Sequence, residues 1–259
     1  MPKSGKGAAR TTEEATNWPA PRSVLRAFPK RRIHVAALAL TLIASVQWIG
    51  AQQYPGHWWT AVPEANKPDW EILPQAAKPG EVILSKRNEL GILSNFAPTP
   101  FTLHGKRYAS VEGFWQMMLY PEDATDPRAR FPGLVWSHAR GEVAQMTAFD
   151  AKNAGTLGEE NMKKMGIDWV TFEGRRMKYW SMEKGVHYRI IVAAMRAKLE
   201  QNTKVKEILL STGTLVLRPD HYQEKNPPAE WEYFQIWMEL RSELQRAFRS
   251  TDSSAQSKN

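Results

Sequence analysis

The residue types with the clearest chemical potential lie close together in the string SVEGFWQ, residues 110–116. From Val111 the apolar residues recur at positions 111, 114, 115, 118 and 119, the spacing of one helical face, and Ser110 is suited to cap that helix. Glu112 lies on the flank of this face, beside Trp115 and one turn before Gln116. A carboxylate at the edge of a hydrophobic core is either a partner of the helix dipole or a catalytic group, and the pattern alone leaves both alternatives open.

The motifs that the sequence lacks narrow the chemistry. There is no cysteine, which excludes a disulfide framework, a thiol nucleophile and thiolate zinc sites. The glycine-rich nucleotide motifs, the His-Glu-x-x-His zinc motif and the Gly-x-Ser-x-Gly hydrolase motif are also missing. We therefore expect neither a cofactor nor a metal, and carboxylates beside aromatic side chains remain. These suit cleavage of an N-glycosidic bond, because an oxocarbenium-like ribose needs a nearby negative charge, a positioned water and a flat surface for the base.

A turn and a hairpin precede this helix and must position it. Pro98 and Pro100 stop any helix that begins at Ser94. Strand-like pieces at residues 101–103 and 106–108 are joined by His104 and Gly105, and the glycine can take the positive φ that a tight hairpin needs. The sequence therefore predicts a hairpin that leads directly into the helix.

The rest of the chain from residue 81 predicts mainly helices. Apolar periodicity indicates helices at 137–149, around 159–165, at 187–201, 205–210 and 229–248. Short strands are expected at 81–85, 168–172 and 214–218. We therefore expect an α+β fold, a helix-dominated single domain over residues 81–248 with a few short strands.

The N-terminal part differs in composition from this domain. Residues 1–32 hold eight Lys or Arg and two Glu, a net of +6 out of +8 for the chain, so the domain has no strong basic patch and sequence-specific nucleic-acid binding is not expected. Residues 33–51 are apolar and follow three basic residues, which is typical of a signal peptide or a transmembrane anchor. The positive-inside rule then places the domain on the extracytoplasmic side, membrane-anchored or exported. A buried core helix or a mis-assigned start, with a cytoplasmic domain, is the alternative.

Two further segments are expected to carry little fixed structure. Residues 52–80 are rich in proline, alanine and tryptophan without periodicity, which indicates an extended linker, with Trp58 and Trp59 as possible interfacial anchors. Residues 249–259 are polar and serine-rich, which indicates a disordered tail, as does the basic composition of residues 1–32.

The string GILSNFAPTPFTLHGKRYASVEGFWQ, residues 91–116, resembles the signature of the NADAR (YbiA-like) N-glycosidase family. It has the Ser-Asn-Phe start, the Pro-Phe strand, the Gly-Lys turn and the Ser-x-Glu-x-x-x-Gln helix. Further similarity lies in AMRAKLEQN, ILLSTG and MELRSEL, so that the resemblance spans roughly residues 83–244. The family cleaves bonds between a ribose carbon and a base nitrogen, and some members remove ADP-ribose from nucleobases. The resemblance therefore implies a YbiA-like fold and a metal-independent N-glycosidase acting on a ribosylated nucleotide-like or ADP-ribose-conjugated substrate.

The resemblance also implies catalytic residues. Glu112 matches the family's catalytic glutamate. The family's tryptophan corresponds either to Trp169, which has the more similar local context, or to Trp180, which is nearer in sequence distance. An acidic residue after the Ser-Thr-Gly turn corresponds to Asp220, which could protonate the leaving nitrogen or hold water, with His221 or Arg218 tuning it. The plainer alternatives are core packing for the tryptophans and a turn cap for Asp220.

Substrate contacts are expected from the residues around these groups. Asn95 and Phe96 complete the Ser-Asn-Phe element and should shape the pocket, while Lys86 or Arg87 could meet a phosphate. Trp115, Gln116, Trp180 and His221 complete the expected substrate-binding set.

The chain departs from the family at residues 227–234, where PPAEWEYF replaces a glycine-rich segment. This departure favours the alternative of a non-catalytic module, tethered at the membrane, that binds ADP-ribose, another nucleotide or a partner.

Overall fold

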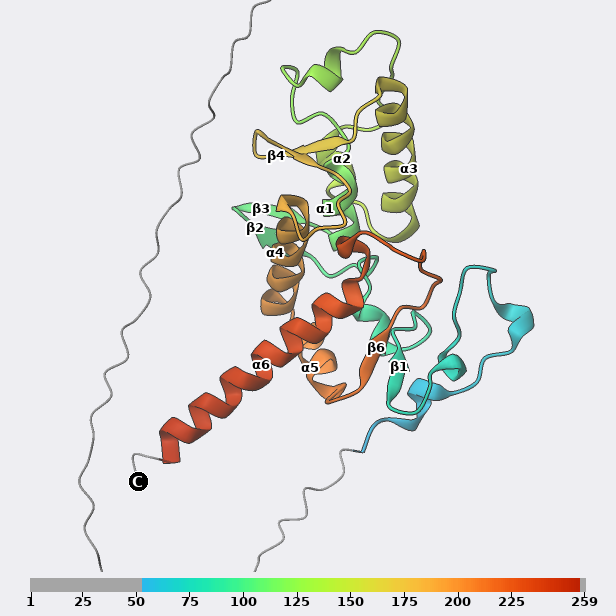
Figure 1. The fold of residues 1–259 in the computed structure, drawn as a ribbon, viewed down its shortest axis with the longest axis vertical. Coiled ribbons are helices and arrows are strands. Elements are labelled where there is room, and N and C mark those ends of the chain that lie inside the picture. The colour runs from blue at the N-terminus through green and yellow to red at the C-terminus, as the bar shows by residue number, and fades with distance from the viewer. Residues whose placement is uncertain (1–52, 257–259) are drawn as a thin grey trace, which may run out of the picture. The chain divides into compact units, whose positions relative to one another are not determined.

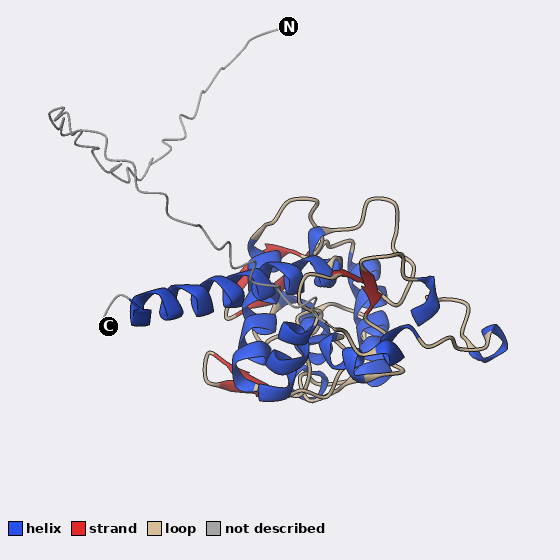
Figure 2. Ribbon diagram, turned by 90° about the horizontal axis from the view of Figure 1, so that it is seen from below, coloured by secondary structure: helices blue, strands red, loops and turns tan. Residues whose placement is uncertain are grey.

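The computed structural model describes residues 53–256. The basic N-terminal segment and the expected signal or anchor at 33–51 lie outside the described residues. Within the part of the chain that is described, no helix combines the length and the apolar composition that a membrane span requires. Helices dominate and the strands are short (Figure 2), as expected for an α+β fold.

Six α-helices and six strands are found in the described residues, together with short 3-10 turns. The helices are α1 (Val111–Met117), α2 (Arg140–Val143), α3 (Ala148–Met165), α4 (Val186–Gln201), α5 (Thr203–Ser211) and α6 (Tyr233–Gln256). The strands are β1 (Glu81–Ile83), β2 (Phe101–Leu103), β3 (Lys106–Tyr108), β4 (Trp169–Phe172), β5 (Arg175–Lys178) and β6 (Val216–Arg218).

The strands pair in twos. β2 and β3 form the expected antiparallel hairpin, and β4 and β5 form a second one. Both turns consist of two residues with positive φ, His104 with Gly105 and Glu173 with Gly174, as a type I′ turn requires. β1 and β6 are parallel neighbours although they are far apart in sequence, with Val82 opposite Leu217. This pairing brings the segment after residue 83 next to the segment after residue 218.

Helix α1 lies at the centre, flanked by α2, α3 and α4 (Figure 1). All seven of its residues are buried, and the Ser110 hydroxyl caps it by accepting a hydrogen bond from the Gly113 amide at 2.9 Å. Two glycines of α3 permit the close approach of α1. A Cβ on Gly155 would lie 2.0 Å from Oε1 of Gln116, and one on Gly158 would lie 2.8 Å from Cβ of Leu119.

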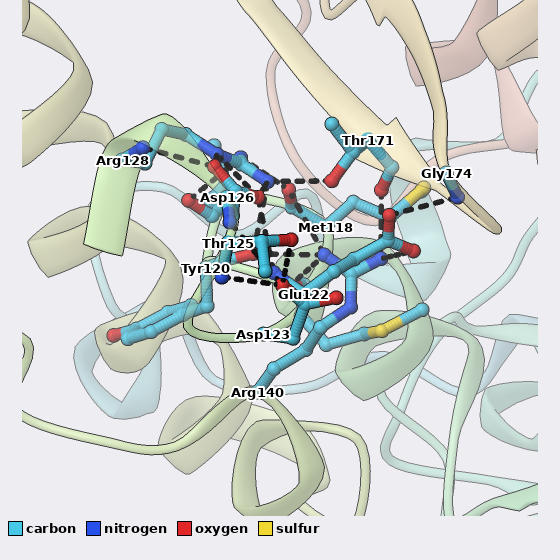
Figure 3. A network of polar contacts seen from close by, with 12 residues as sticks. Met118, Tyr120, Glu122, Asp123, Thr125, Asp126, Arg128, Arg140, Thr171 and Gly174 are labelled. Atoms are coloured by element: carbon cyan, nitrogen blue, oxygen red, sulfur yellow. Dashed lines mark hydrogen bonds and ion pairs between the residues drawn. The ribbon is translucent and has the colours of Figure 1, made fainter. Parts of the chain in front are cut away.

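Two arginines bind the carbonyl groups at the C-terminal end of α1 (Figure 3). Arg128, which is 1% exposed, donates to the carbonyls of Met118, Leu119 and Tyr120 at 2.9 to 3.2 Å and is paired with Asp126. Arg140 donates to the carbonyls of Met117 and Tyr120 at 3.2 and 2.8 Å. These carbonyls belong to the last residue of α1 and to the turn that follows it, so the two guanidinium groups hold the C-terminal end of the helix in place.

The described part of residues 52–80 is not the extended linker that the sequence predicts. Its described part packs against the domain: Trp58 is 1% exposed, and its indole N–H donates to Glu89 at 2.7 Å. Further along, the Glu71 carboxylate makes two hydrogen bonds with Arg87, at 2.7 and 2.6 Å. A buried indole and a bidentate ion pair hold this segment in place, so Trp58 is a core residue of the domain.

Several helices and one strand also differ from the sequence prediction. The helix expected at 137–149 is the short α2, and the helical turn expected around 159–165 belongs to the long α3. Strand β5 was not anticipated. Helix α6 runs to Gln256, into the segment expected to be a disordered tail.

Candidate functional site

A cavity of about 500 Å³ opens beside the N-terminal half of α1. Its walls come from the loop after β1, the Ser94–Phe96 loop, α1, α3, residues 221–224 and the start of α6. Eight aromatic side chains line it: Trp70, Phe96, Trp115, Phe149, Tyr179, Tyr222, Trp231 and Tyr233. Five charged side chains also line it: Lys86, Glu112, Lys152, Glu159 and Glu224. A concave aromatic surface with a few charged groups is the usual form of a small-molecule site.

Glu112 lies in the wall of this cavity and is only 7% exposed. Its backbone amide donates to the Asn95 carbonyl at 2.9 Å, which fixes the start of α1 against the Ser94–Phe96 loop. Oε1 accepts a hydrogen bond from Nε2 of Gln116 at 2.8 Å, whereas Oε2 has no hydrogen-bond partner among the described residues. Burial raises the pKa of Glu112, and the Gln116 hydrogen bond and the charge of Lys152 only partly offset that effect.

A second carboxyl group, Glu159 on α3, lines the same cavity. The Tyr179 hydroxyl accepts from the Trp115 indole at 3.1 Å and donates to Glu159 at 3.4 Å, so the three side chains form a chain of hydrogen bonds. Burial raises the pKa of Glu159, and burial together with the Glu159 charge raises the pKa of Tyr179 well above its usual range. The cavity therefore holds two carboxyl groups that both retain protons more strongly than an exposed glutamate.

Asp220 lies behind the cavity and is not one of its lining residues. It is 1% exposed, forms an ion pair with Lys86 at 2.5 Å and accepts from Nδ1 of His221 at 3.1 Å. Burial acts to raise the pKa of Asp220, but the His221 hydrogen bond and the Lys86 charge outweigh it, and the net shift is downward. Lys86 and His221 both line the cavity, so the Asp220 carboxylate holds them there.

The structure gathers most of the predicted site residues at this cavity. Asn95, Phe96, Trp115, Gln116 and His221 line it with Glu112. Asn95 Oδ1 and Gln116 Oε1 are buried and have no hydrogen-bond partner among the described residues. Gln116 Oε1 packs against Gly155, and Asn95 Oδ1 is an unpaired acceptor enclosed in the cavity wall.

Besides Asp220, three predicted site residues do not line the cavity. Trp169 stacks with Arg176, whose guanidinium carbon is 3.7 Å from the ring centroid, and it does not line the cavity. Trp180 is 43% exposed and borders a neighbouring pocket, although its ring stacks on the cavity residue Tyr179 at 5.3 Å. Arg87 is occupied by Glu71. Neither of the two competing tryptophans lines the cavity, and Trp70, Trp115 and Trp231 provide the indoles that do.

The Ser94–Phe96 loop is held from behind by two helices. Lys198 of α4 is fully buried and its ammonium donates to the Ser94 carbonyl at 2.8 Å, while Trp237 of α6 donates to the Leu93 carbonyl at 2.6 Å. Burial lowers the pKa of Lys198 to about 7. These bonds fix the loop whose next carbonyl, that of Asn95, accepts from Glu112.

Sequence reasoning missed Lys152, Glu159 and Tyr179 as cavity residues. Phe149, Lys152 and Glu159 are three and seven residues apart, so they share one face of a continuous helix. This shared face was overlooked because the sequence prediction placed one helix at 137–149 and another around 159–165, whereas α3 runs without a break from Ala148 to Met165. In residues 53–250 no cluster of His, Asp and Glu could hold a metal ion.

No protein-family model matches the chain, and no curated protein matches it. Among solved structures, the NMR structure of the E. coli protein YbiA is similar to this chain, with 21% sequence identity and a TM-score of 0.41. The matched region covers 64% of this chain and 86% of that one. The functional conclusion therefore rests on the chemistry of the cavity.

Proposed function

We propose that this protein is an N-glycosidase that hydrolyses the bond between ribose and a base in a nucleotide-like substrate. The observation that carries this proposal is the Glu112 carboxyl group, buried in an aromatic cavity with one oxygen free of protein partners. A buried carboxyl group is costly to keep in a fold, and such groups cluster where they do chemistry.

The proposed reaction assigns separate roles to the two carboxyl groups. As the bond between ribose C1 and the base nitrogen breaks, its electron pair leaves with the nitrogen and positive charge develops on the sugar. The ionised Glu112 stabilises this charge and accepts a proton from the water that bonds to C1. Glu159, the second carboxyl group of the cavity, donates a proton to the departing nitrogen in this scheme, and burial raises its pKa. The two carboxyl groups then exchange protons with solvent to restore the starting state.

The aromatic walls and the two lysines suit the rest of such a substrate. Trp115 and Tyr179 offer flat faces to the leaving base, and their mutual hydrogen bond fixes both rings. Lys152 makes no ion pair with a described residue and can bind a phosphate on the sugar, while Lys86, although paired with Asp220, places a second ammonium group in the cavity wall.

The test is a screen of nucleosides, nucleotides and ADP-ribosylated bases, with free base and sugar measured by mass spectrometry. We expect the full chain to release base, and Glu112→Gln to reduce the rate by a factor on the order of 100 or more, since general acid–base groups contribute this much. Ligand affinity should stay within a few-fold, because Gln keeps the size and the Gln116 contact.

Two neighbouring glutamates of α3 give a matched pair of variants. Glu159 lines the cavity and Glu160 is exposed, so Glu159→Gln should slow base release while Glu160→Gln leaves it unchanged. Equal rates for Glu112→Gln and the unaltered chain would remove Glu112 from the mechanism. Binding of these ligands without any release of base would instead support a non-catalytic nucleotide-binding module.

A further inference from the structure

A buried pair of polar side chains lies behind the cavity and takes no part in the proposed reaction. Nδ1 of His187, on α4, lies 3.1 Å from Oε1 of Glu230, and both side chains are 1% exposed. Neither residue lines the cavity. His187 Nε2 and Glu230 Oε2 are also buried and have no hydrogen-bond partner among the described residues. Buried polar atoms without partners lower stability, so stability alone does not explain why this pair interrupts an apolar core.

The pair contacts or adjoins three aromatic side chains of the cavity wall. The His187 ring meets the rings of Trp115 and Tyr179 edge-on, and the centroid distance is 5.3 Å in both cases. Glu230 is the middle residue of a 3-10 turn, and Trp231, which directly follows it, lines the cavity. A single hydrogen bond therefore joins the turn that carries Trp231 to the rings of Trp115 and Tyr179.

The backbone before this turn has few ties of its own. Residues 222–227 make no backbone–backbone hydrogen bond with a described residue. Within the turn the backbone bonds are local, such as the one from the Trp231 amide to the Pro228 carbonyl at 3.0 Å. Among the described residues, the bond between Glu230 and His187 is the hydrogen bond that ties the turn to another helix. We therefore expect the position of Trp231 to depend on it.

We propose that His187 and Glu230 are a positioning pair, whose hydrogen bond fixes Trp231 relative to Trp115 and Tyr179 in the cavity wall. A hydrogen bond is directional, so it specifies one arrangement of the three rings where apolar packing alone allows several. That a base lies against these rings rests on the proposed function, whereas the arrangement of the rings does not.

The experiment compares variants of the full chain that nearly keep the size of the buried side chains. Glu230→Gln retains an oxygen that can accept from Nδ1 of His187, whereas Glu230→Met leaves the imidazole without a partner. The double variant His187→Leu/Glu230→Met replaces both polar groups by apolar ones. Urea unfolding measures the stability of each variant. Glu230→Met should be less stable than the unaltered chain, and the double variant should regain most of the loss, because replacing both partners of a buried hydrogen bond is nearly neutral.

Fluorine NMR of protein labelled with 5-fluorotryptophan reports the position of Trp231. Trp231→Phe and Trp59→Phe identify two of the eleven tryptophan resonances, and Trp59, whose indole donates to the Glu81 carbonyl, is the internal reference. The Trp231 resonance should be sharp and unshifted in Glu230→Gln, but displaced or split in Glu230→Met and in the double variant. Glu232→Met is the matched control, because this half-buried glutamate makes no hydrogen bond or ion pair with a described residue, and it should leave the resonance unchanged.

A binding measurement connects this arrangement to the cavity. The probe is adenosine 5′-monophosphate, measured by calorimetry in proteins that also carry Glu112→Gln, so that no turnover occurs. The double variant should bind the probe about tenfold more weakly than Glu112→Gln alone, as expected when the stacking of one ring is lost. Glu230→Gln should leave the affinity unchanged.

The outcomes separate this proposal from the proposed function. A double variant that regains stability while its Trp231 resonance stays displaced supports a positioning role. If it regains the original resonance as well, the pair only fills the core and the proposal is overturned. Should the double variant not fold, identical Trp231 resonances in Glu230→Met and Glu230→Gln would overturn the proposal, and different ones would support it. Absence of nucleotide binding in every protein would contradict the proposed function alone, because the Trp231 resonance still decides the role of the pair.

Discussion

Replacing Lys198 by methionine should change how the stability of the protein depends on pH. The Lys198 ammonium is 0% exposed, its bond partner is the neutral Ser94 carbonyl, and burial lowers its pKa from 10.5 to about 7. The folded state therefore releases a proton that the unfolded state keeps, and stability rises with pH between about 7 and 10.5.

The magnitude follows from the size of this pKa shift. One pKa unit corresponds to about 1.4 kcal/mol. Relative to a lysine with an ordinary pKa, the lowered pKa of Lys198 therefore reduces the free energy of unfolding by about 5 kcal/mol at pH 6 and by about 2 kcal/mol at pH 9. Methionine does not titrate, so the difference in unfolding free energy between the unaltered chain and Lys198→Met should change by about 3 kcal/mol over this range. Loss of the bond to Ser94 adds an offset of about 1–3 kcal/mol that does not depend on pH.

Urea unfolding at pH 6, 7.5 and 9 measures this difference, with free energies extrapolated to zero denaturant. Titration of other buried groups, such as Tyr179, is common to both proteins and cancels in the comparison. Lys204→Met removes a 65% exposed lysine and should give a difference that is constant across the series. A constant difference for Lys198→Met as well would refute the lowered pKa of Lys198.

Three further predictions concern α1 and its contact with α3. Because the pKa of Glu112 is raised, base release should decline with falling pH at a pH above the value of about 4.3 for an ordinary glutamate, measured as a pH–rate profile. The same shift makes ionised Glu112 a cost that grows as pH rises, so Glu112→Gln should raise the melting temperature at pH 8 and lose that advantage near pH 4. A Cβ at Gly155 would displace the Gln116 amide, so Gly155→Ala should cost about 1–3 kcal/mol in chemical unfolding and lower base release. Gly141→Ala, where a Cβ meets nothing within 4 Å, should do neither, and equal stability of the two variants would contradict the close packing of α1 on α3.

Local sequence signals predicted the parts of the fold that depend on local geometry. The His104-Gly105 turn, the Ser110 cap and the apolar stripe of α1 each act within a few residues, and all three are confirmed. The parallel pairing of β1 with β6 was not predicted, because its partners are more than a hundred residues apart and each is only three residues long. Trp58 was misjudged for a related reason: proline-rich sequence suggests a linker, whereas its burial depends on contacts that no local pattern encodes.

The residues of the candidate site also fall into those that local sequence predicts and those that depend on tertiary packing. Glu112, Asn95 and Gln116 lie within one stretch, and the prediction that they lie together at a cavity follows from that stretch alone. Glu159 and Tyr179 reach the cavity through the packing of α3 and β5 around α1, which depends on Gly155 and Gly158 permitting close approach. Trp169 was favoured for its sequence neighbours, yet its ring lies against the guanidinium groups of Arg128 and Arg176 and does not line the cavity.

The arginine cap on α1 has a consequence for ligand exchange. The helix is bound at its start by Ser110 and Asn95 and at its end by Arg128 and Arg140, so it cannot shift along its axis without breaking several charge-assisted bonds at once. Because Glu112 belongs to this helix, its carboxyl group is held in one place relative to the rest of the cavity wall, and a ligand would meet a site that is already formed.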